Sequence, residues 1–133
     1  MNDQDKIEKV TVNVGIVDLG QMDLLVDQAF YSNRTDFIRT AIRNQLEAHR
    51  KDIQDYVTRK ITAVGVVIYD RHDLEMLRES KTKIEIRLIG QLVFTKDVDV
   101  ELVRDTVKHI QHFGVIKASK EVKEVIKEIQ TLG

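Results

Sequence analysis

The stretch that decides the fold is residues 9–46, KVTVNVGIVDLGQMDLLVDQAFYSNRTDFIRTAIRNQL. It opens with an alternating pattern, because Val10, Val12 and Val14 stand at every second position between polar residues. This alternation predicts a strand with one apolar face. A single strand is unstable alone because its backbone groups lack a partner, so we expect it to pair with the same strand of a second chain.

Two amphipathic helices are expected after the strand. Leu19 and Met22 begin an apolar stripe at helical spacing, which predicts a first helix over residues 18–30. Ser32 is the expected N-cap of a second helix, with Asp36 in its first turn. Roughly fifty residues make a poor core, and without cysteine the remaining means of stabilisation is oligomerisation, which again favours a dimer.

The second of these helices carries a resemblance to a known family. Residues 31–42, YSNRTDFIRTAI, contain a small polar cap, a basic residue just after it and an apolar-apolar-Arg step. This segment is similar to the turn and second helix of ribbon-helix-helix DNA-binding domains of the CopG/Arc/MetJ type, and the strand matches in pattern. The resemblance covers residues 9–46, about a third of the chain. It implies an intertwined dimer whose paired strands form an antiparallel ribbon that enters the major groove.

The resemblance also implies which side chains touch DNA. The expected base contacts, on the polar face of the strand, are Lys9, Thr11 and Asn13. Lysine donates to guanine, asparagine pairs with adenine and threonine contacts thymine, so these residue types suit base reading. The expected phosphate contacts, at the start of the second helix, are Ser32, Asn33 and Arg34. Free amides, the helix dipole and the arginine charge favour an anion at such a helix start.

Charge and the surrounding arginines moderate this prediction. A Lys-x-Thr-x-Asn strand face is by itself typical of a solvated surface, and Arg39 and Arg43 are more typical of an exposed or ion-paired helix face than of a site. The chain holds 21 basic and 22 acidic residues, so it has no basic domain. Residues 34–51 carry five basic residues and two acidic ones, which predicts a moderate salt dependence of DNA binding.

The second half of the chain contains an internal repeat. Gly65, Gly90 and Gly114 are spaced 25 and 24 residues apart. Four residues before them stand Ile61, Ile86 and Ile110, and five residues after them stand the potential N-caps Asp70, Thr95 and Ser119. The agreement predicts three units of strand, glycine bend or bulge, cap and helix, with helices over residues 71–79, 98–109 and 119–132.

Units of this kind predict a small parallel α/β stack of three strand-helix repeats. An alternative divides residues 83–95 into two antiparallel strands that turn at Gly90, which would give a ferredoxin-like βαββαβ fold as in nickel-responsive repressors. The stack is preferred because such a hairpin would leave strands of only about four or five residues, at the short end of the usual range. The fold class is therefore mixed α/β.

The composition and patterning suggest three segments. Residues 1–50 are predicted to form the ribbon-helix-helix DNA-binding and dimerisation domain, and residues 51–60 a helical extension that continues the second helix. Residues 61–133 form the repeat domain, for oligomerisation or for binding a partner or effector. No apolar run approaches ~18 residues and the acidic start differs from a signal peptide, so we expect no membrane association and a cytoplasmic location.

The second half of the chain contains few residues that could form a metal site or a catalytic site. His109-x-x-His112 has ligand spacing, but no cysteine or further histidine completes a site. The acidic residues of segment 97–101 are expected from helix capping and the helix dipole. No phosphate-binding loop or nucleophile-base set is recognisable. We therefore expect no enzyme activity, no metal and no cofactor.

The sequence thus predicts a homodimeric, sequence-specific transcriptional regulator, a repressor that reads a palindromic operator in double-stranded DNA. Residues 61–133 would mediate any higher oligomer. One alternative is an antitoxin of a toxin-antitoxin pair, although antitoxin tails are commonly less ordered than these repeats. Another alternative is an assembly scaffold that uses the ribbon-helix-helix only to dimerise.

Overall fold

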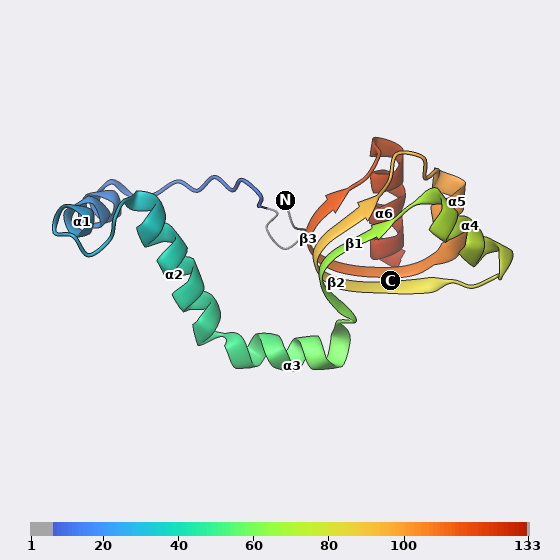
Figure 1. The fold of residues 1–133 in the computed structure, drawn as a ribbon, viewed down its shortest axis with the longest axis horizontal. Coiled ribbons are helices and arrows are strands. Elements are labelled where there is room, and N and C mark those ends of the chain that lie inside the picture. Colours follow the sequence, from blue (N-terminus) through green and yellow to red (C-terminus); the bar gives the residue numbers. More distant parts are fainter. Residues whose placement is uncertain (1–6, 133) are drawn as a thin grey trace. The chain divides into compact units, whose positions relative to one another are not determined.

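The computed structural model describes residues 7–132, which contain six helices and three strands (Figure 1). The chain divides into two compact units, one spanning Ile7–Tyr56 and one that begins at Val57. The division falls inside the segment 51–60. No helix in the described part of the chain is both long and apolar enough to cross a membrane.

The first unit is helical. Helix α1 spans Ile16–Asp27 and α2 spans Arg34–Ala48, while α3, Arg50–Lys60, runs across the boundary into the second unit. The first helix ends three residues before the predicted position 30, because Ala29 adopts a left-handed φ of 64° that no helix can continue. The predicted strand over residues 9–14 is not formed, since a single chain offers it no partner strand.

The second helix also differs from its predicted course. Its N-cap is Asn33 and not Ser32, because the Asn33 side chain accepts a hydrogen bond from the Asp36 amide at 2.7 Å. The prediction of one continuous helix through residues 51–60 is wrong. Helix α2 ends at Ala48, and α3 begins one residue beyond His49, whose carbonyl accepts from the Ile53 amide at 3.0 Å.

The second unit is a parallel stack of three strand-helix repeats. Its elements, in chain order, are β1 (Ala63–Tyr69), α4 (Arg71–Glu79), β2 (Ile84–Phe94), α5 (Val100–Thr106), β3 (Val107–Lys117) and α6 (Lys120–Leu132). The strands lie in the order β1-β2-β3, and both pairs are parallel. The ferredoxin-like alternative is wrong, because β2 continues through Gly90 as one strand of 11 residues.

The helices of this unit follow the predicted repeat with one exception. Helix α4 has the predicted bounds, and Ser119 precedes α6 with its hydroxyl accepting from the Val122 amide at 3.2 Å. Helix α5 is shorter than the predicted 98–109, because its N-cap is Asp99 rather than Thr95 and the chain enters β3 at Val107. Both histidines of the His109-x-x-His112 motif therefore lie in a strand.

The core of the second unit lies between one face of the sheet and the three helices. The strands contribute alternate residues, and the fully buried side chains include Leu88 and Leu92 of β2. The helices contribute Leu74 of α4, Leu102 and Val103 of α5, and Val122 and Ile126 of α6. Leu102 and Ile126 stand at the same repeat position, twelve residues after Gly90 and Gly114, so α5 and α6 contribute equivalent residues to the core.

The sheet depends on a row of three aligned glycines. Gly65, Gly90 and Gly114 are direct neighbours in the register of the three strands, with φ values of 131°, 136° and 125°. A Cβ on Gly90 would lie 1.9 Å from the carbonyl oxygen of Gly65, and one on Gly114 would lie 2.1 Å from that of Gly90. The pairing passes the glycines without an extra residue, so they form a bend rather than a bulge.

We expect Gly90→Ala to destabilise the second unit more than Gly65→Ala. Both substitutions force alanine into a left-handed φ, at a cost of ~1 to 3 kcal/mol. Only at Gly90 must the new methyl also displace backbone, since the equivalent space at Gly65 contains no atom within 4 Å. Urea unfolding should therefore show a loss of at least ~3 kcal/mol for Gly90→Ala. Equal losses for the two variants would mean that the close approach is unimportant.

Candidate nucleic-acid interface

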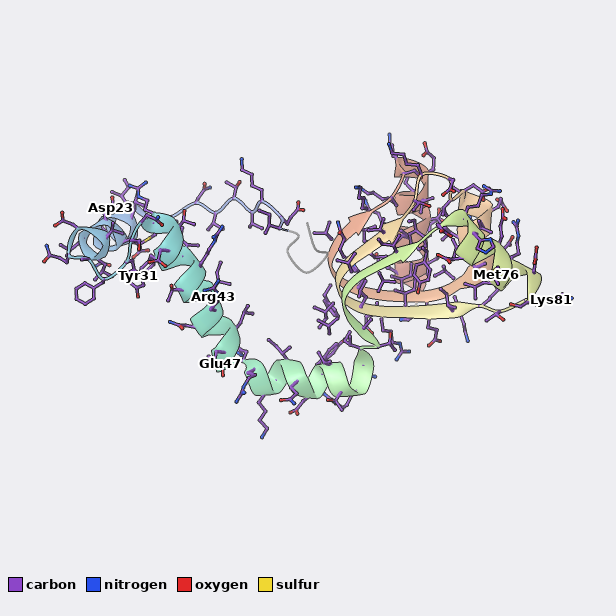
Figure 2. The ribbon with its side chains drawn as sticks, viewed as in Figure 1. Asp23, Tyr31, Arg43, Glu47, Met76 and Lys81 are labelled. Atoms are coloured by element: carbon purple, nitrogen blue, oxygen red, sulfur yellow. The ribbon has the colours of Figure 1, made fainter. Side chains whose placement is uncertain are left out.

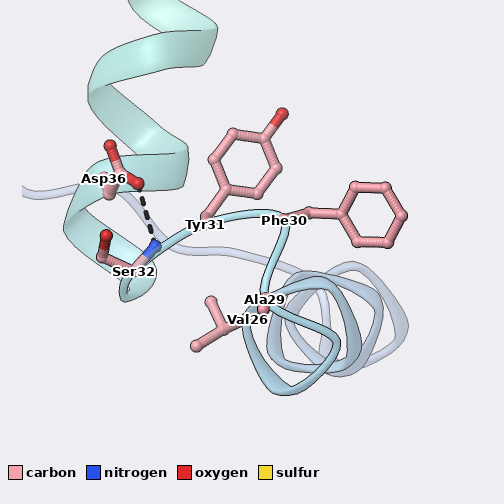
Figure 3. A pocket seen from close by; sticks show the side chains of 6 residues that line it. All are labelled: Val26, Ala29, Phe30, Tyr31, Ser32 and Asp36. Atoms are coloured by element: carbon pink, nitrogen blue, oxygen red, sulfur yellow. Dashed lines mark hydrogen bonds between the residues drawn. The ribbon is translucent and has the colours of Figure 1, made fainter.

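The turn between α1 and α2 brings the three predicted phosphate contacts together. Asn33 caps α2, and the side chain of Asp36 folds back so that its Oδ2 accepts from the Ser32 amide at 2.9 Å (Figure 3). The Ser32 amide is thus already occupied. The amides of Asn33 and Arg34 have no acceptor within residues 7–132, so they are the donors that this helix start offers to an anion.

The same turn is packed by aromatic and apolar side chains. The rings of Tyr31 and Phe37 meet edge to face with centroids 5.0 Å apart. A shallow pocket of about 340 Å³ lies beside them, and the residues that line it are Val26, Ala29, Phe30, Tyr31, Ser32 and Asp36 (Figure 3). The Phe30 side chain remains 71% exposed. The turn is therefore ordered by local contacts while still presenting apolar surface.

Arg34 is held by a partner that sequence reasoning missed. Its Nε and Nη2 donate to the two carboxylate oxygens of Asp23 in α1, each at 2.8 Å. The hydrogen bond from Arg34 and its positive charge lower the pKa of Asp23, and the same bond raises the pKa of Arg34. The pair fastens the start of α2 to α1, with Asp23 and Tyr31 at this end of the unit in Figure 2. Asp23 also offsets the charge that Arg34 offers to a phosphate.

The predicted base contacts are not yet arranged as a reading surface. Lys9, Thr11 and Asn13 are all exposed and lie in a segment without strand structure. The apolar residues between them are exposed as well, with Val10 at 78% and Val12 at 72%. The structure of one chain therefore brings Ser32, Asn33 and Arg34 together but leaves the other three residues without the pairing that would align them.

The first unit as a whole buries very little. Within residues 7–56, Met22 is the only buried side chain. Large apolar side chains of both helices and of the preceding segment are 40% or more exposed, among them Ile16, Val17, Leu24, Ile38, Ile42 and Leu46. Burial of apolar surface is the main favourable term in folding, so a unit of this length with one buried residue gains little stability from its own core.

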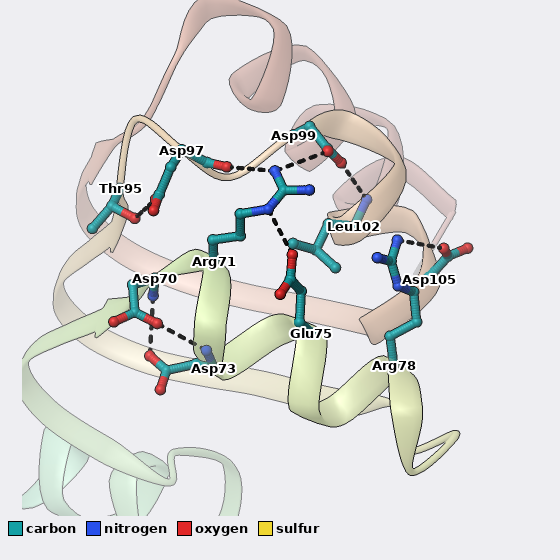
Figure 4. A network of polar contacts seen from close by, with 10 residues as sticks. All are labelled: Asp70, Arg71, Asp73, Glu75, Arg78, Thr95, Asp97, Asp99, Leu102 and Asp105. Atoms are coloured by element: carbon teal, nitrogen blue, oxygen red, sulfur yellow. Dashed lines mark hydrogen bonds and ion pairs between the residues drawn. The ribbon is translucent and has the colours of Figure 1, made fainter.

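The acidic segment of the second unit is accounted for by structural contacts. Asp99 caps α5 by accepting from the Leu102 amide at 2.8 Å, and this bond lowers its pKa. Arg71 of α4 donates to Asp99 at 3.2 Å, to the Asp97 carbonyl at 2.9 Å and to Glu75 at 2.6 Å (Figure 4). These contacts join α4 to the start of α5, so the carboxylates serve the fold.

The histidines do not form a metal site either. His112 places Nε2 3.1 Å from the Val115 carbonyl and 3.2 Å from that of Gly90, beside the glycine row. Within residues 7–132, no group of three or more histidine, cysteine or acidic side chains is placed to hold a metal ion. The polar arrangement that remains as a candidate site is therefore the exposed face of the first unit.

Comparison with known families gives one match. A sequence model described as "Ribbon-Helix-Helix transcriptional regulator family" matches residues 5–123. The chain belongs to this family. The match extends well beyond residues 9–46, so the predicted resemblance, over the first third of the chain, was too narrow. The matched region also contains β1, α4, β2, α5 and β3. No curated protein and no solved structure matches the chain.

The Asp23–Arg34 pair should make the first unit sensitive to acid. Because the pKa of Asp23 is lowered below 3.8 in the folded protein, its contribution is fully present above that value. The contribution is lost as pH falls through the lowered folded pKa. We therefore expect wild type to be more stable than Asp23→Asn at neutral pH, with the difference vanishing in strong acid. Thermal unfolding of both proteins along a pH series measures this, and a difference that persists in strong acid would contradict it.

Proposed function

We propose that the protein is a sequence-specific, DNA-binding transcriptional regulator that acts as a homodimer. Membership of the ribbon-helix-helix regulator family supports regulation of transcription. The observation that carries the finer proposal is the unfinished state of the first unit, in which an alternating segment lacks a strand partner and the apolar faces of two helices are exposed. A second copy of the chain supplies both missing parts at once.

In the proposed dimer, residues 9–14 of the two chains pair as an antiparallel ribbon. Val10, Val12 and Val14 then face the helices, whose exposed apolar residues form a shared core. Lys9, Thr11 and Asn13 face outward on the opposite side, where they read base edges in the major groove. Pairing is what aligns these three side chains, since it fixes the alternation of the backbone.

The start of α2 positions the ribbon on DNA. The amides of Asn33 and Arg34 receive a phosphate, and the Arg34 guanidinium adds charge when it shares its contacts between Asp23 and the phosphate. These contacts fix register without reading sequence. The Ser32 hydroxyl is the remaining donor of that residue, because its amide is bonded to Asp36.

The physiological role follows from such binding. A twofold-symmetric dimer fits a palindromic operator, and occupation of an operator represses by excluding other proteins from a promoter. This regulator would act in the cytoplasm without a metal, a cofactor or a catalytic step. The second unit has a closed core of its own, unlike the weakly ordered tail expected of an antitoxin.

Dimerisation should depend on the apolar face of the ribbon and not on its polar face. We expect Val12→Glu to dissociate the dimer that a fragment of residues 1–50 forms at micromolar concentration, because it buries a carboxylate in the shared core. Thr11→Glu is the matched control, since it adds the same charge to the outward face and should leave the dimer intact. Sedimentation velocity separates the two. A folded wild-type monomer at these concentrations would overturn the dimer.

DNA binding should separate reading from positioning. Asn13→Ala should relax the base preference at one position of each half-site, at ~1 to 3 kcal/mol per lost contact. Arg34→Ala should instead weaken all sequences about equally and reduce the salt dependence by about one unit of slope per lost phosphate contact. Asp23→Asn should act in the opposite direction, because it frees the Arg34 charge.

The operator for these measurements comes from selection out of random DNA with the full-length protein. An assembly scaffold would select no sequence. If Asn13→Ala kept full discrimination while losing affinity, the outward face of the ribbon would not be the reading face. If neither Asn13→Ala nor Arg34→Ala changed binding to a selected operator, recognition would lie outside this region.

A further inference from the structure

One edge of the parallel sheet is open and unprotected. Strand β1 is the first in the order β1-β2-β3, so the backbone groups on its outer edge face no other strand within residues 7–132. Its sequence, AVGVVIY, contains no charged residue and no proline. Proteins usually protect an exposed strand edge with charged residues or proline, because an open edge pairs readily with another chain.

The opposite edge is protected in the usual way. Strand β3 carries the exposed lysines Lys108 and Lys117 near its two ends. Lysine on an edge strand opposes pairing because its charge would be desolvated. The two ends of the stack therefore differ, and only the β1 end is suited to association.

The helix next to β1 shares this character. Met76 of α4, labelled in Figure 2, is 57% exposed. Val64 and Ile68 of β1 are 68% and 48% exposed. A groove of about 570 Å³ runs between the two elements, and its lining consists of Ile68, Tyr69, Asp73, Met76, Leu77 and Ser80. The terminal repeats of a stack normally present a polar outer face. The outer face at the β1 end is apolar instead.

Several charges of α4 are engaged in contacts within the chain, and Asp73, which lines the groove, accepts from the Asp70 amide at 3.0 Å. Arg71 is paired with Glu75 and Asp99, and Arg78 lies 3.7 Å from Asp105 of α5 (Figure 4). These pairs turn toward the neighbouring repeat of the same chain. The open side of the helix is thus left with Met76 as its large apolar residue.

Gly65 leaves the outer edge of β1 open. At Gly90 and Gly114 the space of the missing Cβ is filled by the carbonyl of the preceding strand. At Gly65 the same space is empty, although the residue has the same left-handed φ. The outer edge of β1 at Gly65 is therefore not obstructed by a side chain or by neighbouring backbone, which leaves room for a strand that pairs there.

We propose that β1 and α4 form an isologous interface with the same elements of a second copy of the chain. The two β1 strands pair antiparallel about Val66, the centre of the seven-residue strand, so that Val64 of each copy lies opposite Ile68 of the other. The two sheets join into one, and the two α4 helices meet at Met76. A twofold arrangement closes on itself, whereas addition of β3 to β1 would continue without end and would bury the edge lysines.

This interface is independent of DNA binding, and it is tested in the full-length protein. The chain contains no cysteine, so a single introduced thiol reports only on contacts between copies. Val66→Cys, treated with a short bismaleimide, should form a covalent dimer. The matched control is Val115→Cys, which lies on the same face of the sheet in the same row of the register. We expect cross-linking at position 66 to be ~100-fold faster than at 115, because docking raises the effective concentration from micromolar toward millimolar.

A second variant and a mixture sharpen the test. Ile68→Lys in the Val66→Cys background should reduce the cross-linking rate to that of the control, and circular dichroism checks that the half-exposed substitution leaves the protein folded. Equal rates for Val66→Cys and Val115→Cys would overturn the proposal. Cross-links that form mainly in a mixture of the two variants would also overturn it, because they would show β3 of one copy added to β1 of another.

Discussion

The close approach of backbone at Gly65, Gly90 and Gly114 is the constraint on which the second unit depends. Each carbonyl occupies the space where the next glycine lacks a Cβ, so the three strands must stay in one register. Register in turn places the same repeat position of every strand on the same face. The helices α4, α5 and α6 can then cover that face in order, and their apolar residues complete a single core.

The repeat could be predicted because the glycines are regularly spaced, and this spacing can be recognised without knowing the contacts of the surrounding residues. Helix α5, which is shorter than predicted, shows what the glycine spacing cannot predict. Thr95 stands at the repeat position of a cap, yet it donates to the Asp97 carboxylate and Asp99 caps α5 instead. Two polar residues that compete for one cap cannot be ranked from spacing, since the outcome depends on where Arg71 reaches across from α4.

The first unit was less predictable for a different reason. The helix start at residues 32–36 was recognisable, but the choice of Asn33 over Ser32 as the cap rests on the Asp36 side chain bonding the Ser32 amide. The Asp23–Arg34 pair joins residues that are 11 positions apart and lie in two different helices. No local sequence pattern predicts such a contact. The strand over residues 9–14 carries a clear pattern and is still absent from a single chain, because pairing is a property of two strands and not of one sequence.

Paired residues of neighbouring strands in the second unit lie close together in the sequence, and this affects how the chain folds. Paired residues of neighbouring strands are 23 to 25 positions apart, as in Ala63 with Leu88 and Ile86 with Ile110. Loops of that length close at modest entropic cost, so a single chain can complete the second unit by itself. The first unit, under the proposed dimer, must wait for an encounter between two chains. The concentration of the protein in the cell then determines the fraction of chains that are dimeric and able to bind DNA. The rate of synthesis would therefore affect regulation directly.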